Sequence, residues 1–225
     1  MKNITLVNDL KNIYAENLVS VVSYGEKQDI LVIFNTLEAS DLKKALPVMK
    51  IRIKAKNPLP IVMSEEEWLG SADIYPIEYT EIKNNYKILY GKDVVSEIKI
   101  VKSDLRLRCE YEIKNVLVRI RQLYLGNSDN PKFMVKTLEE TSLKLIRILK
   151  SALSLFDIPA PEDYSEVIRA IAQKHNFDGE IFVEILSAKE SKRTFSDQKV
   201  ETLVQRAINS TDALYNFINN LENLY

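Results

Sequence analysis

Two short apolar segments on either side of Gly25 constrain the fold of this chain more than any other feature. Residues 18–24 and 30–34 are rich in β-branched and aromatic side chains, which is typical of β-strands. Alternate residues of the second segment place apolar side chains on both faces, Ile30, Val32 and Phe34 on one and Leu31 and Ile33 on the other. Such a strand is usually central and covered by helices. The pattern therefore predicts a sheet enclosed by helices.

Further elements surround this pair within the first hundred residues. Ser40 is a suitable N-cap for a helix, and Ser64 with Glu67 three residues later forms a capping box for another. Apolar spacing and turn residues complete the assignment. We expect helices over residues 4–16, 41–54 and 64–70, and extended segments over residues 58–63, 73–82 and 86–90.

From about residue 101 onward the pattern is helical only. Apolar residues recur every three or four positions, which is typical of packed amphipathic helices; the first run is Leu105, Cys109, Ile113, Val116, Ile120 and Tyr124. We expect successive helices over residues 105–126, 131–156, 163–175, 178–189 and 196–222. The fold class is therefore α+β: a mixed sheet with flanking helices over residues 1–98, followed by an all-α helical bundle domain over residues 99–225.

Composition excludes several classes of protein. The balance of 31 Lys and Arg against 32 Asp and Glu gives a net charge of −1, so no overall field favours a nucleic acid or a membrane. The single Cys109 falls within a helical pattern, where a buried thiol in a reducing compartment is expected. No apolar run reaches the ~18 residues of a membrane span, and the first residues lack the apolar region of a signal peptide. We expect a cytoplasmic protein with no membrane partner.

A helix, a strand that ends in Tyr24-Gly25, a short loop, Asp29 and an apolar strand follow one another in this chain. This order resembles that of the nucleotidyltransferase (polymerase β-like) superfamily. Pro76-Ile77-Glu78 and residues 88–91 are similar to the third acidic strand and the closing strand of that family. The resemblance covers about residues 4–95, and it implies a nucleotidyltransferase-like sheet, behind which a helical bundle is a common arrangement.

In this family a Gly-Ser turn approaches the nucleotide phosphates, and three carboxylates hold Mg²⁺. The resemblance makes Gly25 the nucleotide-binding glycine, and Asp29 and Glu78 the first and third metal-binding carboxylates. Glu26 replaces the serine, where its charge would repel phosphate. Leu31 replaces the second aspartate, and a side chain without lone pairs cannot bind Mg²⁺. The implied site is degenerate, with Mg²⁺ as a cofactor only where a nucleotide is bound.

We therefore expect little or no nucleotidyl transfer, and a nucleotide-binding or regulatory role. If activity survives, Asp29 and Glu78 are the remnant catalytic candidates. The same stretch also fits a tight hairpin in which Gly25 adopts a positive φ and Asp29 ends a strand. The two interpretations are compatible, because a fold can keep its hairpin after its site has been lost.

Two other functions stay open. One is a partner-binding protein without nucleotide affinity, which uses the helical domain as an oligomerisation or antitoxin-like surface. The other is an RNA-cleaving protein, because Arg169 and His175 match the Arg-x4–6-His motif of the HEPN ribonucleases, in which the imidazole acts as an acid or base. The same two residues also suit the C-terminal end of a helix.

Nucleic-acid binding through the first long helix is not indicated. Its arginines are paired two residues apart, Arg106 with Arg108 and Arg119 with Arg121, so that they point to different sides of the helix. Glu110 and Glu112 lie four residues beyond the first two, where ion pairs form readily. Motifs of zinc sites, P-loops and serine hydrolases do not occur in the sequence.

Overall fold

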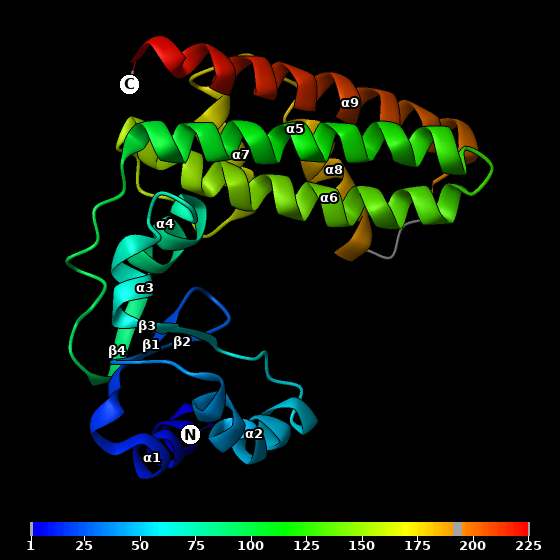
Figure 1. Cartoon of the computed structure of the whole chain (residues 1–225). Helices are drawn as coiled ribbons and strands as arrows, with labels where there is room; N and C mark the ends of the chain where they lie inside the picture. The colour runs from blue at the N-terminus through cyan, green and yellow to red at the C-terminus, as the bar shows by residue number, and fades with distance from the viewer. Residues whose placement is uncertain (1, 191–194, 225) are drawn as a thin grey trace. The chain divides into compact units, whose positions relative to one another are not determined.

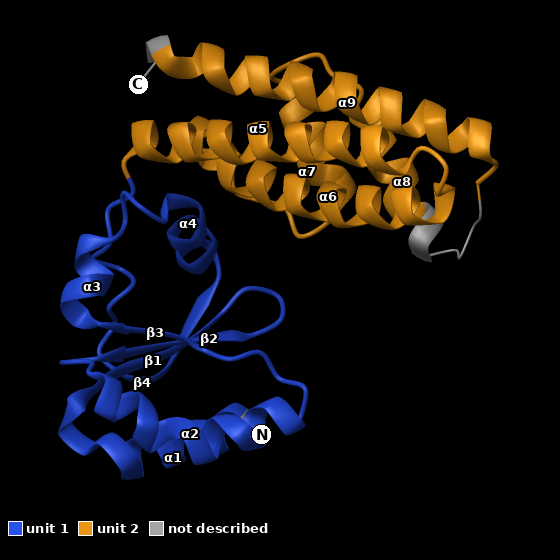
Figure 2. Cartoon of the chain, turned by 45° about the vertical axis from the view of Figure 1, so that its right-hand side comes forward, with its two compact units in different colours: residues 1–100 blue, residues 101–225 orange. Residues whose placement is uncertain are grey.

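The chain divides into two compact units, Met1–Ile100 and Val101–Tyr225 (Figure 2). The computed structural model describes residues 2–190 and 195–224. Unit 1 combines a four-stranded sheet with helices, and the described part of unit 2 is built from helices. The protein is therefore α+β, as the sequence predicts.

The sheet of unit 1, which lies between helices in Figure 1, is mixed and has the order β3-β2-β1-β4. β1 pairs antiparallel with both β2 and β4, whereas β2 and β3 are parallel. The two strands around Gly25 are confirmed, and β2, which is apolar on both faces, lies in the interior of the sheet. The strands are β1 Leu18–Tyr24, β2 Asp29–Phe34, β3 Ile61–Ser64 and β4 Tyr86–Gly91.

Helices cover both faces of this sheet. On one face α1 Lys2–Tyr14 and α2 Ala39–Lys54 enclose a core that includes Ile30, Val32 and Phe34 of β2. On the other face α3 Glu65–Gly70 and α4 Pro76–Asn84 enclose a second core, which includes Leu31 and Ile33. The alternation of β2 thus divides its side chains between the two cores, which explains why both of its faces are apolar.

The expected extended segment over residues 73–82 is wrong, because α4 occupies most of it. Polar and apolar residues alternate briefly in this segment, as they do in a strand. The residues that are buried nevertheless recur at helical spacing, namely Pro76, Tyr79, Thr80 and Ile82. Pro76 stands at the start of the helix, where its missing N–H costs nothing.

The expected N-cap of α2 is also wrong. The helix begins at Ala39 rather than Asp41, and Glu38 precedes it instead of Ser40. The Asp41 carboxylate accepts a hydrogen bond from the Glu38 backbone N–H at 3.1 Å. A reciprocal bond to the Glu38 side chain completes a capping box. The capping box expected at Ser64 and Glu67 is present, with bonds of 3.1 and 2.7 Å.

Unit 2 is organised around two long helices and a third that packs beside them. The apolar run predicted from Leu105 to Tyr124 is buried along α5 as far as Ile120, Cys109 included, whereas Tyr124 is only partly buried. Arg106 and Arg108 pair with Glu110 and Glu112 at 2.7 and 3.0 Å, as the four-residue spacing predicts. The helices are α5 Lys102–Asn127, α6 Pro131–Ala152, α7 Tyr164–Ala172, α8 Glu180–Glu190 and α9 Asp197–Asn220. Over residues 2–190 and 195–224, every helix is too short or too polar to cross a membrane.

Candidate functional site at the β1–β2 hairpin

The stretch that resembles a nucleotide-binding loop is a tight hairpin turn. Tyr24 and Asp29 form the last pair of β1 and β2, and the four residues between them close the turn. Gly25 adopts φ +65° and Gln28 φ +54°, and the Gln28 N–H donates to the Gly25 carbonyl oxygen at 3.2 Å. Such left-handed conformations favour glycine, because a Cβ crowds the backbone there. Gly25 is therefore explained by the turn itself.

Replacing Gly25 with alanine is expected to destabilise unit 1 by about 1 kcal/mol, because a Cβ is strained at this positive φ. Space does not decide the result, since the nearest atom to an added Cβ is a Glu81 carboxylate oxygen at an ordinary 3.6 Å. Chemical denaturation followed by Trp68 fluorescence measures the change. Gly70→Ala is the matched control: an added Cβ meets nothing within 4 Å there, and its stability should not fall. Equal losses in both variants would contradict the assignment.

The surroundings of Gly25 disfavour a bound phosphate. Its backbone N–H already donates to the Asn85 carbonyl oxygen at 2.9 Å, so this amide is not available to an anion. The Glu81 carboxylate lies beside the glycine, and Glu26 is exposed in the same turn. Two negative side chains at the turn would repel the phosphates that the family's serine loop attracts.

The expected third acidic strand is a helix, and Glu78 lies in the first turn of α4. The pKa of Tyr24 is raised to about 12, first by burial and then by the negative charges of Asp29, Glu81 and Glu78. The structure therefore brings Asp29 and Glu78 into the same electrostatic neighbourhood. The sequence did not identify Glu81, because an extended segment would place residues 78 and 81 on opposite faces. In a helix they share a face.

Leu31 stands where the resemblance would place a second metal-binding aspartate, and in the structure it belongs to the core. Its side chain is 0% exposed and lies in one cluster with Trp68, Tyr79 and Ile82. The Trp68 and Tyr79 rings stack with centroids 4.0 Å apart, and the Tyr79 hydroxyl donates to the Trp68 carbonyl oxygen at 2.7 Å. Burial raises the pKa of Tyr79 above its ordinary value. Tight packing thus fills the space that a second cation ligand would require.

The residues present do not fit a pair of Mg²⁺ ions. One carboxylate oxygen of Glu78, Oε2, is buried without a hydrogen-bond partner and is the atom best suited to a cation. Across residues 2–190 and 195–224, however, no three or more Asp, Glu, His or Cys side chains are grouped so as to hold a metal ion. Asp29 also lies in the electrostatic neighbourhood of a cation. Burial lowers the pKa of Arg52, and the negative charge of Asp29 acts in the opposite direction.

The ribonuclease candidates Arg169 and His175 lie near the end of α7. Within the described part of the chain, no hydrogen bond joins their side chains. Arg169 is exposed on the helix, which ends at Ala172 rather than at residue 175 as expected. The His175 ring stacks on Phe217 of α9, with centroids 4.7 Å apart and planes 6° from parallel. A packing role accounts for His175 in this position.

Unit 2 also contains a hollow of about 380 Å³ that the sequence did not indicate. It lies where the end of α5, the start of α6 and the start of α9 meet, and Asp129, Asp197 and Glu201 contribute carboxylates to it. The Tyr124 hydroxyl donates to Glu201 at 3.0 Å, and this hydrogen bond raises the pKa of Tyr124. An open, acidic hollow offers no counterion for a phosphate.

No protein-family model matches the chain, and a search of curated proteins finds no match either.

Proposed function

We propose that this chain is a non-catalytic, nucleotidyltransferase-like protein with a regulatory role, which acts by binding another protein. The observation that carries the proposal is the complete burial of Leu31 where the related enzymes place a metal-binding aspartate. Nucleotidyl transfer depends on cations that neutralise the phosphates and align the attacking hydroxyl. Asp29 and Glu78 alone supply too few ligands for that arrangement.

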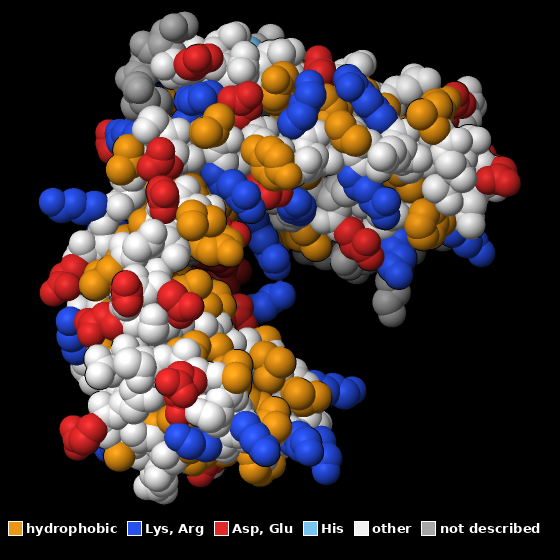
Figure 3. Space-filling view, viewed as in Figure 1, with side chains coloured by type: hydrophobic (Ala, Val, Ile, Leu, Met, Phe, Trp, Pro, Cys, Tyr) orange, Lys and Arg blue, Asp and Glu red, His pale blue; other side chains and the backbone are white. Residues whose placement is uncertain are grey.

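An exposed apolar face on α5 supports the protein-binding role. Leu107, Tyr111, Val118 and Leu125 are each exposed, and Leu125 is 83% exposed. Their spacings of four and seven residues place them on one side of the helix. Hydrophobic and basic side chains alternate on the face of unit 2 that Figure 3 shows. Large apolar side chains exposed along one side of a helix among basic residues favour contact with a protein surface.

A thermal-shift screen with nucleoside triphosphates and Mg²⁺ tests the proposal. A ligand at about 100 times its Kd adds about 2.7 kcal/mol of stability, which raises the Tm of a domain of this size by several degrees. We expect no Mg²⁺-dependent shift with any nucleotide at millimolar concentration, and no transfer of labelled nucleotide to protein or RNA.

Two variants give the screen its control. Asp29→Asn and Glu78→Gln remove the charges of the remnant carboxylates and preserve their shapes. We expect the nucleotide response of both variants to equal that of the wild type. A shift in the wild type that either variant abolishes would overturn the proposal, because it would identify a working nucleotide site at the hairpin.

RNA cleavage is the second assay that bears on the proposal. We expect no cleavage above the rate given by a His175→Ala variant prepared in parallel. Cleavage that this substitution removes would instead support the ribonuclease alternative at Arg169 and His175.

A further inference from the structure

Two neighbouring segments of unit 1 carry opposite and unmixed charges. Residues 42–64 contain six basic side chains and no acidic one, namely Lys43, Lys44, Lys50, Arg52, Lys54 and Lys56. Residues 65–82 contain six acidic side chains and no basic one, namely Glu65, Glu66, Glu67, Asp73, Glu78 and Glu81. The whole chain is nearly neutral, with a net charge of −1, so its total charge does not reveal this separation. The separation is a local property of unit 1.

The fold places these two segments on opposite faces of the sheet. α2, which carries most of the basic residues, packs on the core that contains Val32 and Phe34. α3 and α4, which carry the acidic residues, pack on the core that contains Leu31 and Ile33. Figures 1 and 2 both show α2 on one side of the strands and α3 with α4 on the other.

The basic side of unit 1 is also apolar. Leu42, Leu46 and Ile53 are each roughly half exposed on α2, and their spacing places them on one side of the helix, away from the buried Ala45. Lys43, Lys50 and Lys54 lie on the same helix beside this stripe. These six side chains define the basic face. Hydrophobic and basic side chains gather over this part of unit 1 in Figure 3.

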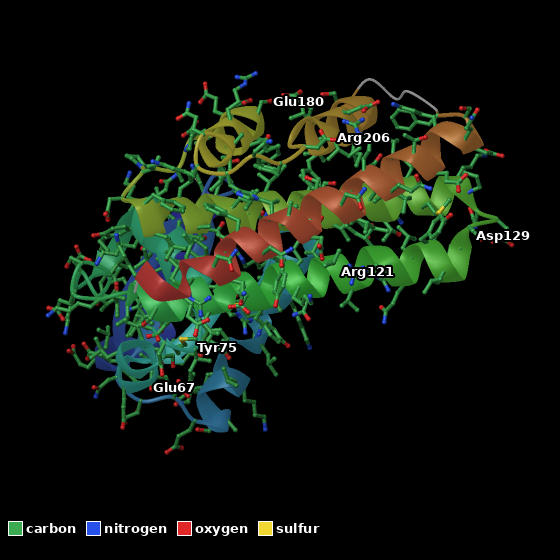
Figure 4. The ribbon with its side chains drawn as sticks, turned by 90° about the horizontal axis from the view of Figure 1, so that it is seen from above. Glu67, Tyr75, Arg121, Asp129, Glu180 and Arg206 are labelled. Atoms are coloured by element: carbon green, nitrogen blue, oxygen red, sulfur yellow. The ribbon has the colours of Figure 1, made fainter. Side chains whose placement is uncertain are left out.

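The acidic side of unit 1 is apolar in the same way. Leu69, Ile74 and Tyr75 are between about two fifths and a little over half exposed on α3 and the turn before α4. Glu66, Glu67 and Asp73 are exposed among them. These six side chains define the acidic face, of which Figure 4 labels Glu67 and Tyr75.

The charges of the two faces are not neutralised within the unit. Lys44 pairs with Asp41 at 2.8 Å, and Glu65 pairs with Lys92 at 2.5 Å, but both pairs lie outside the two faces as defined. Within residues 2–190 and 195–224, the lysines of the basic face and the carboxylates of the acidic face form no ion pair. Each face therefore presents apolar contact area together with charge of one sign that no ion pair within the described residues neutralises.

We propose that the basic face binds the acidic face of a second copy of this chain. The two faces lie on opposite sides of one sheet, so they cannot meet within a single copy. Opposite charges around apolar centres are the complementarity that orients protein interfaces. Contact between two different faces is head-to-tail, so a pair of copies still has one basic face and one acidic face open to further copies. The inference rests on the protein-binding role proposed above and names the partner.

Sedimentation velocity of the full chain at about 50 mM and about 1 M salt tests this assembly. The Debye length falls from more than 10 Å to about 3 Å over that range, so charge-directed association should weaken strongly. At low salt we expect the average mass to rise above that of one chain between about 10 and 500 µM, the range in which moderate affinities are populated. High salt should return it to one chain. A single-chain mass throughout the low-salt series would overturn the proposal.

Charge-reversal variants identify the faces. Lys50→Glu with Lys54→Glu reverses the basic face, and Glu66→Lys with Asp73→Lys reverses the acidic face. Glu67 is left unchanged because it belongs to the capping box of α3. We expect each double variant to stay at the mass of one chain. A mixture of the two should assemble, because the intact acidic face of the first variant meets the intact basic face of the second.

Lys87→Glu with Lys99→Glu is the matched control, since both lysines are exposed in unit 1 outside the two faces. This double variant has the same charge change as the basic-face variant and should assemble as the wild type does. Circular dichroism confirms that every variant is folded before it is compared. Assembly that survives in the face variants, or that the control also loses, would overturn the proposal. None of these results depends on nucleotides, so this proposal and the absence of catalysis can fail separately.

Discussion

Replacing Leu31 with aspartate is expected to destabilise the sheet of unit 1 severely at neutral pH. The side chain is 0% exposed in the core beneath α3 and α4, where an unpaired carboxylate loses its hydration without gaining a partner. We expect a loss of more than about 4 kcal/mol, against a total stability of about 5–15 kcal/mol for a typical domain. Trp68 is the single tryptophan and lies buried in unit 1, so its fluorescence reports this unit specifically.

Leu31→Met is the matched control for this prediction. Methionine has a similar volume and no charge, and such exchanges usually cost less than about 1.5 kcal/mol. A large loss with aspartate and a small one with methionine would show that charge, rather than shape, is excluded from this position. If the aspartate variant instead folds normally and gains stability with Mg²⁺, the position is an open site and the proposed loss of catalysis is wrong.

The central strands could be predicted from sequence because their signal is local and unambiguous. β2 is short, rich in β-branched residues and apolar at alternate positions on both faces, which is typical of a strand covered on both faces. The capping box at Ser64 and the ion pairs of α5 were also predictable, since they join residues three or four positions apart. Interactions between residues three or four positions apart can be recognised from the spacing of the residue types in the sequence.

The neighbourhood of the hairpin was less predictable because α4 has an ambiguous period. When residues 73–82 are interpreted as a strand, Glu78 is the one residue in them that is proposed as a metal-binding carboxylate. Read as the helix that it is, the same segment brings Glu78 and Glu81 to the hairpin together. Pro76 at the first turn was the signal that favours the helix. The basic and acidic faces could not be predicted from sequence. The two blocks of charge are adjacent in the chain, and only the fold shows that the sheet separates them.

Some ion pairs in unit 2 join residues far apart in the sequence, so the spacing of charged residues does not predict them. The most extensive of these joins Arg206 to two carboxylates. Arg206 of α9 donates to both carboxylate oxygens of Asp178 at 2.7 and 3.0 Å, and to Glu184 of α8 at 2.8 Å. Lys199 reaches the second oxygen of Glu184 at 2.7 Å. Replacing Arg206 with methionine is expected to cost about 1–2 kcal/mol, since partial exposure weakens each charged hydrogen bond.

The pH dependence of this loss follows from the two carboxylates. Hydrogen bonding to Arg206 lowers the pKa of Asp178, and Lys199 followed by Arg206 lowers the pKa of Glu184. A pKa that is lower in the folded state stabilises the fold above the ordinary value of the group, here 3.8 for Asp178 and 4.5 for Glu184. The contribution disappears as the pH falls through the folded pKa. Wild type and Arg206→Met should therefore differ most above about pH 5 and converge in more acidic solution.

Urea denaturation between about pH 3 and pH 7, followed by circular dichroism, measures this convergence. Arg121→Met is the matched control, because Arg121 makes a single contact with Asp212 at 3.3 Å and both side chains are more than two fifths exposed. An exposed pair of this kind contributes little, so this variant should lose no more than about 0.5 kcal/mol at any pH. A loss in Arg206→Met that is constant across the pH range would contradict the assignment, because it would trace the effect to packing of the arginine stem rather than to the two carboxylates.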